Sequence, residues 1–157
     1  LGVTFEQPCE TTNDIKAVRA LTTSPISVDE TLVSLNDMVR IAHEGIAEVV
    51  NIKINRVGGL TKARRIRDVA ITHGIQIYVM ATGGSVMADT EAAALAQSTP
   101  DEFRLGCWAC QDMLTVDVAP GTGPRTKNGH LLVPDLPGLG FSPDESLLGD
   151  PSAVYRS

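Results

Sequence analysis

The sequence is poor in cysteine, in aromatic residues and in long apolar runs. Its 157 residues include 3 Cys, 1 Trp, 2 Tyr and 3 Phe. No apolar run reaches the roughly 18 residues that a membrane-spanning helix needs, and there is neither a basic leader before an apolar segment nor a lipidation signature. An odd number of cysteines favours a reducing compartment over a disulfide framework. We therefore expect a cytoplasmic protein that does not bind a membrane.

An excess of basic charge is also missing. The chain carries 13 Lys and Arg against 19 Asp and Glu, which gives a formal net charge of −6 and a pI near 4.9. This balance argues against a phosphate-binding surface, so nucleic acid is not an expected partner. By contrast, a content of 43% hydrophobic and 20% charged residues is typical of a globular domain that buries a core.

Cys107-Trp-Ala-Cys110 has the spacing of a thioredoxin-like redox pair. Such a pair requires its first cysteine at a helix N-terminus early in the fold, whereas this one comes late in the chain. A structural zinc site would need a second pair of ligands, which is absent from the sequence. We therefore assign neither redox chemistry nor zinc to these cysteines.

Short apolar runs alternate with segments of helical periodicity along most of the chain. This pattern is typical of βαβ units and predicts an α/β fold with a parallel sheet. From Pro120 onward, frequent glycine and proline predict a turn-rich extension over residues 120–157, with at most a short hairpin around residues 130–133. The predicted strands are 1–5, 25–28, 49–54, 75–80 and 104–109, and the predicted helices are 13–22, 32–46, 61–73 and 85–97.

Three polar residues lie at or near the ends of successive predicted strands. Glu6, Asp29 and Lys53 are each followed by the turn into a helix, and in a (β/α) barrel this end of the strands holds the active site. In the third strand, alternation with a period of two places Asn51, Lys53 and Asn55 on one face. The aliphatic side chains of Val50, Ile52 and Ile54 then point toward the helices.

Two carboxylates without nearby cysteine or histidine suit a hard cation such as Mg²⁺. A lysine beside such a site can remove the acidified α-proton of a carboxylate substrate, because burial and the cation lower its pKa. For any one residue the alternative is favoured, with Glu6 and Asp29 as strand-end caps and Lys53 extending to solvent. Three such residues on three successive strands shift the balance toward an active site.

Four segments carry a family resemblance. FEQP (5–8), SVDET (27–31), NIKINRVGGLTKARRI (51–66) and GHLLVPDLPGLGF (129–141) resemble the second half of the enolase superfamily barrel, in the mandelate racemase and muconate lactonizing enzyme branch. The resemblance implies the C-terminal part of a (β/α) TIM-type barrel, about strands four to eight, over residues 1–119. It also implies that Glu6 and Asp29 are the second and third Mg²⁺ ligands and that Lys53 is the acid/base lysine of the sixth strand.

A finer resemblance points to members that act on amino acids. TGGSV (82–86) and WACQDM (108–113) are similar to segments of cis-3-hydroxyproline dehydratases, which eliminate the 3-hydroxyl after α-proton removal. The resemblance implies that Trp108 covers the substrate ring or faces its ammonium group, and that Asp112 pairs with the ring nitrogen. Core packing for Trp108 and turn capping for Asp112 are the alternatives. Asn55, Thr82 and Gly83 are the other predicted substrate-binding residues.

The mandelate racemase type carries a histidine near the end of the seventh strand, where this sequence has Met80. The resemblance therefore favours the lysine-based type.

A complete barrel takes about 250 residues, and the first metal carboxylate and the Lys-x-Lys pair of the family have no counterpart here. We expect the N-terminal remainder, with its capping domain, to be a separate chain of a cleaved or split enzyme. A truncated product that persists by association is the alternative. The extension over 120–157 is expected to pack on the capping domain, and the family commonly forms homo-oligomers.

Three functions stay open at this point. The main prediction is a Mg²⁺-dependent dehydratase of a small carboxylate, with cis-3-hydroxy-L-proline as the substrate that the resemblance implies. A racemase or epimerase of a proline-like amino acid, or an acid-sugar dehydratase, would use the same proton abstraction. A non-catalytic half-barrel that binds a partner protein belongs to a different class, and metal binding by Glu6 and Asp29 would distinguish it from the enzymes.

Overall fold

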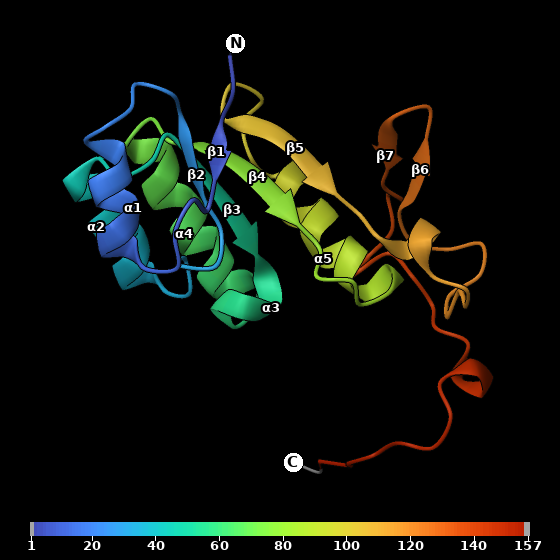
Figure 1. Cartoon of the computed structure of the whole chain (residues 1–157). Coiled ribbons are helices and arrows are strands. Elements are labelled where there is room, and N and C mark those ends of the chain that lie inside the picture. The colour runs from blue at the N-terminus through green and yellow to red at the C-terminus, as the bar shows by residue number, and fades with distance from the viewer. Residues whose placement is uncertain (1, 156–157) are drawn as a thin grey trace.

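The computed structural model describes residues 2–155 and contains a parallel sheet of five strands. The strands are neighbours in the order in which they occur in the sequence, from β1 to β5 (Figure 1). This confirms the predicted alternation of strands and helices around a parallel sheet. The strands are β1 (Phe5–Glu6), β2 (Ile26–Val28), β3 (Val49–Lys53), β4 (Gln76–Met80) and β5 (Arg104–Trp108).

Capping residues set the ends of the helices between these strands. Ser34 and Ser85 accept hydrogen bonds from backbone N–H groups in the first turns of α2 and α5. Gly45 and Gly74, both at positive φ, follow the ends of α2 and α4. For this reason α2 is shorter than the predicted 32–46. The helices are α1 (Thr12–Arg19), α2 (Leu35–Glu44), α3 (Ile54–Val57), α4 (Leu60–Thr72) and α5 (Val86–Gln97).

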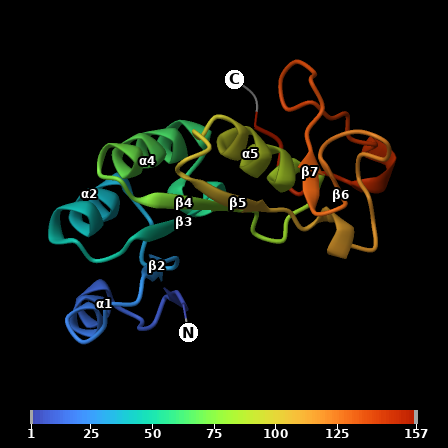
Figure 2. The same cartoon turned by 90° about the horizontal axis from the view of Figure 1, so that it is seen from above.

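The sheet is curved, and its helices lie on one side of it (Figure 2). Val50 and Ile52 of β3 are fully buried toward these helices, as the alternation in the sequence predicts. The core that they join consists of fully buried side chains of neighbouring strands and helices, among them Val28, Ile77, Val79, Ile15, Met38, Ile41 and Ile66. The opposite, concave face is lined by Asn51, Tyr78 and Leu105, and Leu105 is 51% exposed.

The prediction that Asn55 continues the face of Asn51 and Lys53 is wrong. The strand β3 ends at Lys53, and Ile54 begins the one-turn helix α3. Ile54 is 4% exposed in α3. Burial is also expected for a strand, so an apolar residue at this position does not distinguish the two structures. Because the backbone turns at this point, Asn55 leaves the concave face.

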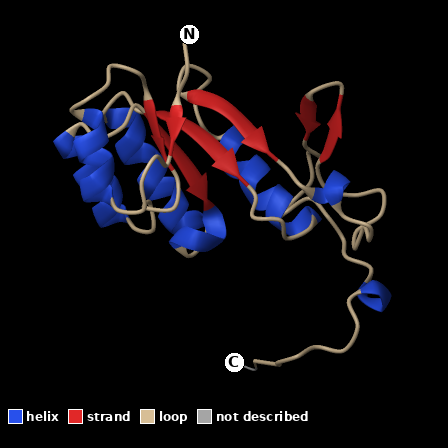
Figure 3. Cartoon of the chain, viewed as in Figure 1, coloured by secondary structure: helices blue, strands red, loops and turns tan. Residues whose placement is uncertain are grey.

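The C-terminal segment is rich in turns, as predicted (Figure 3). It contains the 3₁₀ turns η1 (Gln111–Met113) and η2 (Glu145–Leu147), and an antiparallel hairpin of β6 (Arg125–Lys127) and β7 (His130–Leu132). The hairpin is longer than predicted. Gly123 packs directly against Val86 of α5, so the beginning of this segment contacts the sheet domain of the same chain. No helix within residues 2–155 is both long and apolar enough to cross a membrane.

Candidate active site

A buried ion cluster lies at the C-terminal ends of β2 and β3. The Nζ of Lys53 is 2.6 Å from Oδ2 of Asp29, and Nη1 of Arg56 is 2.6 Å from Oδ1 of the same carboxylate. Arg56 also donates a hydrogen bond to the Asp29 carbonyl. The Asp29 side chain is 5% exposed, and those of Lys53 and Arg56 are 16% and 18% exposed. The predicted base and one predicted metal ligand are thus in direct contact.

Gln7 connects the loop after β1 to the loop after β2. Its Oε1 accepts a hydrogen bond from the backbone N–H of Asp29 at 2.8 Å and from the N–H and hydroxyl of Thr31. Its Nε2 donates to the carbonyl of Cys9. Gln7 has a φ of +38°, a left-handed conformation that is uncommon for residues other than glycine. The contact fixes the backbone of Asp29 relative to that of Glu6.

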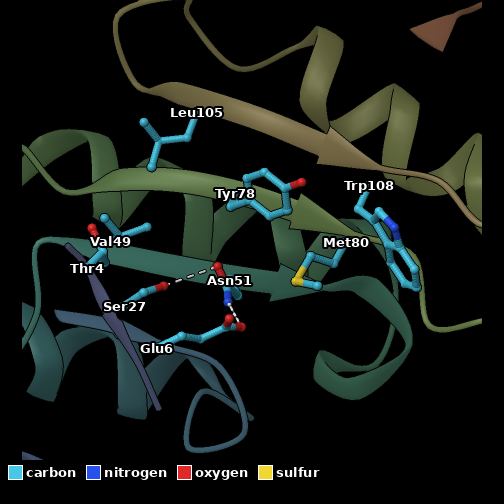
Figure 4. Close-up of a pocket in the computed structure, with 9 residues that line it drawn as sticks. All are labelled: Thr4, Glu6, Ser27, Val49, Asn51, Tyr78, Met80, Leu105 and Trp108. Atoms are coloured by element: carbon cyan, nitrogen blue, oxygen red, sulfur yellow. Dashed lines mark hydrogen bonds between the residues drawn. The ribbon is translucent and has the colours of Figure 1, made fainter. Parts of the chain in front are cut away.

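Glu6 is held from β3 on the concave face of the sheet (Figure 4). The Nδ2 of Asn51 donates a hydrogen bond to Oε1 of Glu6 at 2.7 Å. The hydroxyl of Ser27 donates in turn to Oδ1 of Asn51 at 3.2 Å. Among the described residues, Oε1 is the only Glu6 oxygen that accepts a side-chain hydrogen bond.

Strand register aligns Lys53 with Trp108. Lys53 is paired with Met80 of β4, and Met80 with Trp108 of β5, so the three residues form one row at the ends of the strands. Glu6, Met80 and Trp108 also line a hollow of about 430 Å³ on the concave face, and Tyr78 and Leu105 are among its other lining residues (Figure 4). Trp108 lies in the same row as the lysine, one strand beyond Met80, and its predicted role over a substrate stays a prediction.

The other predicted substrate-binding residues lie at the edge of this arrangement. Nδ2 of Asn55 donates a hydrogen bond to the hydroxyl of Thr82, which ties α3 to the loop after β4. Both residues and Gly83 are exposed. Asp112 is exposed on η1, and its side chain makes no hydrogen bond or ion pair with any residue between 2 and 155. Substrate contact by these four residues stays a prediction.

Gly106 allows the ring of Tyr78 to lie across β5. A Cβ at Gly106 would be 2.8 Å from Cε2 of Tyr78, closer than such atoms approach one another. We expect Gly106→Ala to displace the ring and to lower the free energy of unfolding by about 1–3 kcal/mol, as overpacking does. Urea denaturation of the assembled protein measures this change. Gly2→Ala is the control, since a Cβ there meets no described atom within 4 Å; an equal effect of both variants would contradict the prediction.

The cysteines of the C-x-x-C segment are free and shielded. Burial, with the negative charge of Asp89, raises the pKa of Cys107 to about 11. Burial and a hydrogen bond to Asp89 likewise raise the pKa of Cys110. Both thiols are therefore protonated at neutral pH, which is the opposite of what a redox pair needs. The same Asp89 accepts hydrogen bonds from the backbone N–H groups of Cys110 and Gln111 and so anchors the segment after β5.

The oxygen donors of Glu6 and Asp29 are of the kind that Mg²⁺ prefers, and Mg²⁺ often takes only one or two protein carboxylates. Both Asp29 oxygens are engaged by cationic side chains. Within residues 2–155 there is no group of three or more His, Cys, Asp or Glu side chains that could hold a metal ion. The donor chemistry of Glu6 and Asp29 fits Mg²⁺, and their role as metal ligands stays a prediction.

Comparison with protein families matches residues 3–147 to the enolase C-terminal domain-like family. The chain belongs to this family. The resemblance that the four sequence segments indicated is thereby confirmed, as is the α/β fold of part of a barrel. In this enolase-type domain Glu6 ends β1, Asp29 follows β2 and Lys53 ends β3.

Individual relatives of this enolase-type domain are named for several reactions. It is 40% identical over 155 residues to cis-3-hydroxy-L-proline dehydratase of Roseibium aggregatum, covering 99% of this chain and 42% of the relative. It is 36% identical over 131 residues to N-succinylamino acid racemase of an Amycolatopsis species, covering 81% of this chain and 34% of the relative. The chain thus spans about two fifths or less of the length of these relatives.

Solved structures show the same fold. A candidate mandelate racemase/muconate lactonizing enzyme from Silicibacter pomeroyi is 60% identical with a TM-score of 0.96, over 99% of this chain and 43% of that one. An enolase superfamily member from Roseovarius nubinhibens ISM, in complex with magnesium, is 41% identical with a TM-score of 0.95, over 99% of this chain and 42% of that one. Magnesium therefore occurs in a solved structure of the family.

Sequence reasoning missed Arg56 and Gln7, both of which contact Asp29. Arg56 follows Lys53 by three positions, which is one helical turn, but this stretch reads as a strand in the sequence. Gln7 stands inside the segment FEQP that supported the resemblance, although no role was assigned to it. The contacts of Asn51 could have been sought, since alternation already placed it on the face of Lys53.

Proposed function

We propose that this chain is the C-terminal part of a Mg²⁺-dependent dehydratase that removes the α-proton of a small carboxylate. One observation carries the proposal: the buried contact between Lys53 and Asp29 lies beside Glu6 at the C-terminal ends of parallel strands. Lys53 has little access to water, and a cation that took up the Asp29 carboxylate would remove the ion pair that holds the lysine in its charged form, which leaves Nζ able to act as a base. When bound, Mg²⁺ would stabilise the negative charge that develops on the substrate.

The residues of this chain then have separate tasks. Glu6 and Asp29 would contribute oxygen ligands, and Asp29 holds Lys53 in place until that contact opens. The Nζ of Lys53 would take the proton from the α-carbon. The electron pair of the broken C–H bond would form a double bond to the β-carbon, and the 3-hydroxyl would leave as water with a proton from an acid outside these residues. The cyclic enamine so formed would become an imine by tautomerisation.

The proposed substrate is cis-3-hydroxy-L-proline. It is supported by the 40% identity to the Roseibium dehydratase and by the position of Trp108 in one row with Lys53. The indole face could lie against the pyrrolidine ring or its ammonium group, a contact worth about 0.5–2 kcal/mol. In this proposal Asp112, Asn55, Thr82 and Gly83 approach the substrate when the remaining part of the site is in place.

We further propose that the N-terminal remainder of the enzyme, as a separate chain, supplies the strands that complete the barrel. The sheet ends at β1 and β5, and the concave face between them holds the hollow that includes Leu105 and Trp108. A closed barrel fills such a face with side chains from all of its strands. Residues 120–157 would then pack on a capping domain. The relatives are more than twice as long as this chain, which leaves room in them for such a domain. The partial barrel would comprise residues 1–119.

An epimerase is the second candidate, because the Amycolatopsis relative is named as a racemase. It would abstract the same α-proton and return one from the opposite face. The two reactions differ in the fate of the 3-hydroxyl.

The test is incubation of the assembled protein and Mg²⁺ with cis-3-hydroxy-L-proline in deuterated water. A dehydratase should form the cyclic imine, and L-proline, which has no hydroxyl to lose, is the matched substrate control. Deuterium at the α-carbon of recovered substrate without imine would favour the epimerase. If neither product nor exchange occurs with either compound while Mg²⁺ also fails to bind, the non-catalytic half-barrel becomes the better explanation.

A further inference from the structure

Two buried polar side chains, Ser27 of β2 and Asn51 of β3, form a chain of hydrogen bonds that ends at Glu6 of β1. Ser27 and Asn51 are 5% and 4% exposed, at inward positions where barrels usually place branched apolar residues. Burying a hydroxyl and an amide is unfavourable unless both find hydrogen-bond partners. Here the two side chains bind each other, and the amide of Asn51 extends the contact to Glu6.

The hydrogen bonds fix the orientation of the Asn51 amide. Since the hydroxyl of Ser27 donates to Oδ1 of Asn51, the amide nitrogen must face the opposite way. In that direction lies Oε1 of Glu6, 2.7 Å from Nδ2 (Figure 4). Glu6 itself is exposed on a two-residue strand, so its own surroundings restrain its side chain weakly. The restraint comes from β3.

We propose that Asn51 is a positioning residue that holds the Glu6 carboxylate for metal binding, with Ser27 setting the direction of its amide. The proposal rests on the proposed function. With Oε1 held by Asn51, Oε2 of Glu6 accepts no side-chain hydrogen bond from the described residues and would be the oxygen that binds a metal ion. Residues that orient a metal ligand in this way commonly change metal affinity by about 10–100-fold when they are substituted.

The test replaces the donor by an acceptor of the same shape. In Asn51→Asp a carboxylate oxygen faces Oε1 of Glu6, and the repulsion should turn Glu6 away. We expect the dissociation constant for Mn²⁺, measured by electron paramagnetic resonance on the assembled protein, to rise about 10–100-fold. Asn36→Asp makes the same chemical change at an exposed position of α2 and should leave the constant unaltered. An Asn51→Asp protein that binds Mn²⁺ as tightly as the original overturns the inference.

Ser27→Ala tests the second part and remains decisive if Asn51→Asp fails to fold, which circular dichroism would reveal. It removes one hydroxyl, leaves Asn51 in place and frees its amide to rotate. We expect a smaller rise in the Mn²⁺ dissociation constant, about two- to tenfold, as for loss of one hydrogen bond. An unaltered Mn²⁺ dissociation constant in a folded Ser27→Ala protein would contradict the role of Ser27 in setting the direction of the Asn51 amide. If the original protein itself binds no Mn²⁺, the proposed function fails. If the original protein and all variants bind Mn²⁺ equally tightly, only the positioning role of Asn51 fails.

Discussion

Replacing Lys53 by methionine should lower kcat for dehydration by about 10²–10⁴-fold, the usual contribution of a positioned general base. Methionine keeps most of the length of the side chain but cannot accept a proton. The substitution also removes the cation on Oδ2 of Asp29, so Mn²⁺ binding should be retained or improved. Formation of the imine from cis-3-hydroxy-L-proline measures the rate, and electron paramagnetic resonance measures the bound Mn²⁺.

Lys62→Met provides the control for this result. Lys62 is an exposed lysine of α4, and its substitution should change kcat by less than about twofold, as expected for a surface residue outside the site. A Lys53→Met protein with the original kcat would remove the lysine from the mechanism. Loss of Mn²⁺ binding together with activity would instead assign Lys53 a structural role.

Replacing Asp29 by alanine should have the largest effect on stability. Two cationic side chains, each less than a fifth exposed, would then lie together without their shared carboxylate. Removing one partner of a buried ion pair typically costs about 3–5 kcal/mol, because the remaining charge is left without compensation. Urea denaturation should therefore show a loss of that size in the free energy of unfolding. Mn²⁺ binding should be abolished in the same variant.

Asp68→Ala is the matched comparison for Asp29→Ala. Asp68 also pairs with an arginine at 2.6 Å, but its side chain is 54% exposed. Exposed ion pairs contribute about 0–1 kcal/mol, so this variant should be nearly as stable as the original protein. If the two substitutions destabilise the protein equally, the cluster around Asp29 is not the stabilising feature that its burial suggests.

The strands and helices could be predicted because their periodicity is strong and their ends are marked. Ser85 and Gly74 indicated helix ends, and the structure places them where α5 begins and α4 has ended. The alternation in β3 correctly separated Asn51 from Val50 and Ile52. Parallel strands bring their carboxyl ends to one edge, so the proximity of Lys53 and Asp29 followed from topology without knowledge of side chains.

The remaining parts of the site depend on contacts that leave no local pattern. Ile54 is buried whether the chain continues as a strand or turns into α3, so hydrophobicity could not show where β3 ends. That turn directs Arg56 back to Asp29, 27 positions earlier in the sequence. The hydrogen bond between Gln7 and the Asp29 backbone spans 22 positions, and periodicity carries no information about such a pairing.

The Gln7 bridge also limits how this protein can change. Loops after the strands of a barrel usually accept insertions and diverge separately. Here a single amide spans the first two loops, and a residue inserted into either one would move the backbone N–H of Asp29 or Thr31 away from it. The two loops are therefore expected to tolerate changes in length only together. By contrast, Leu21 in the connection between α1 and β2 is 88% exposed, and that connection offers an engineer a more permissive site for an inserted tag.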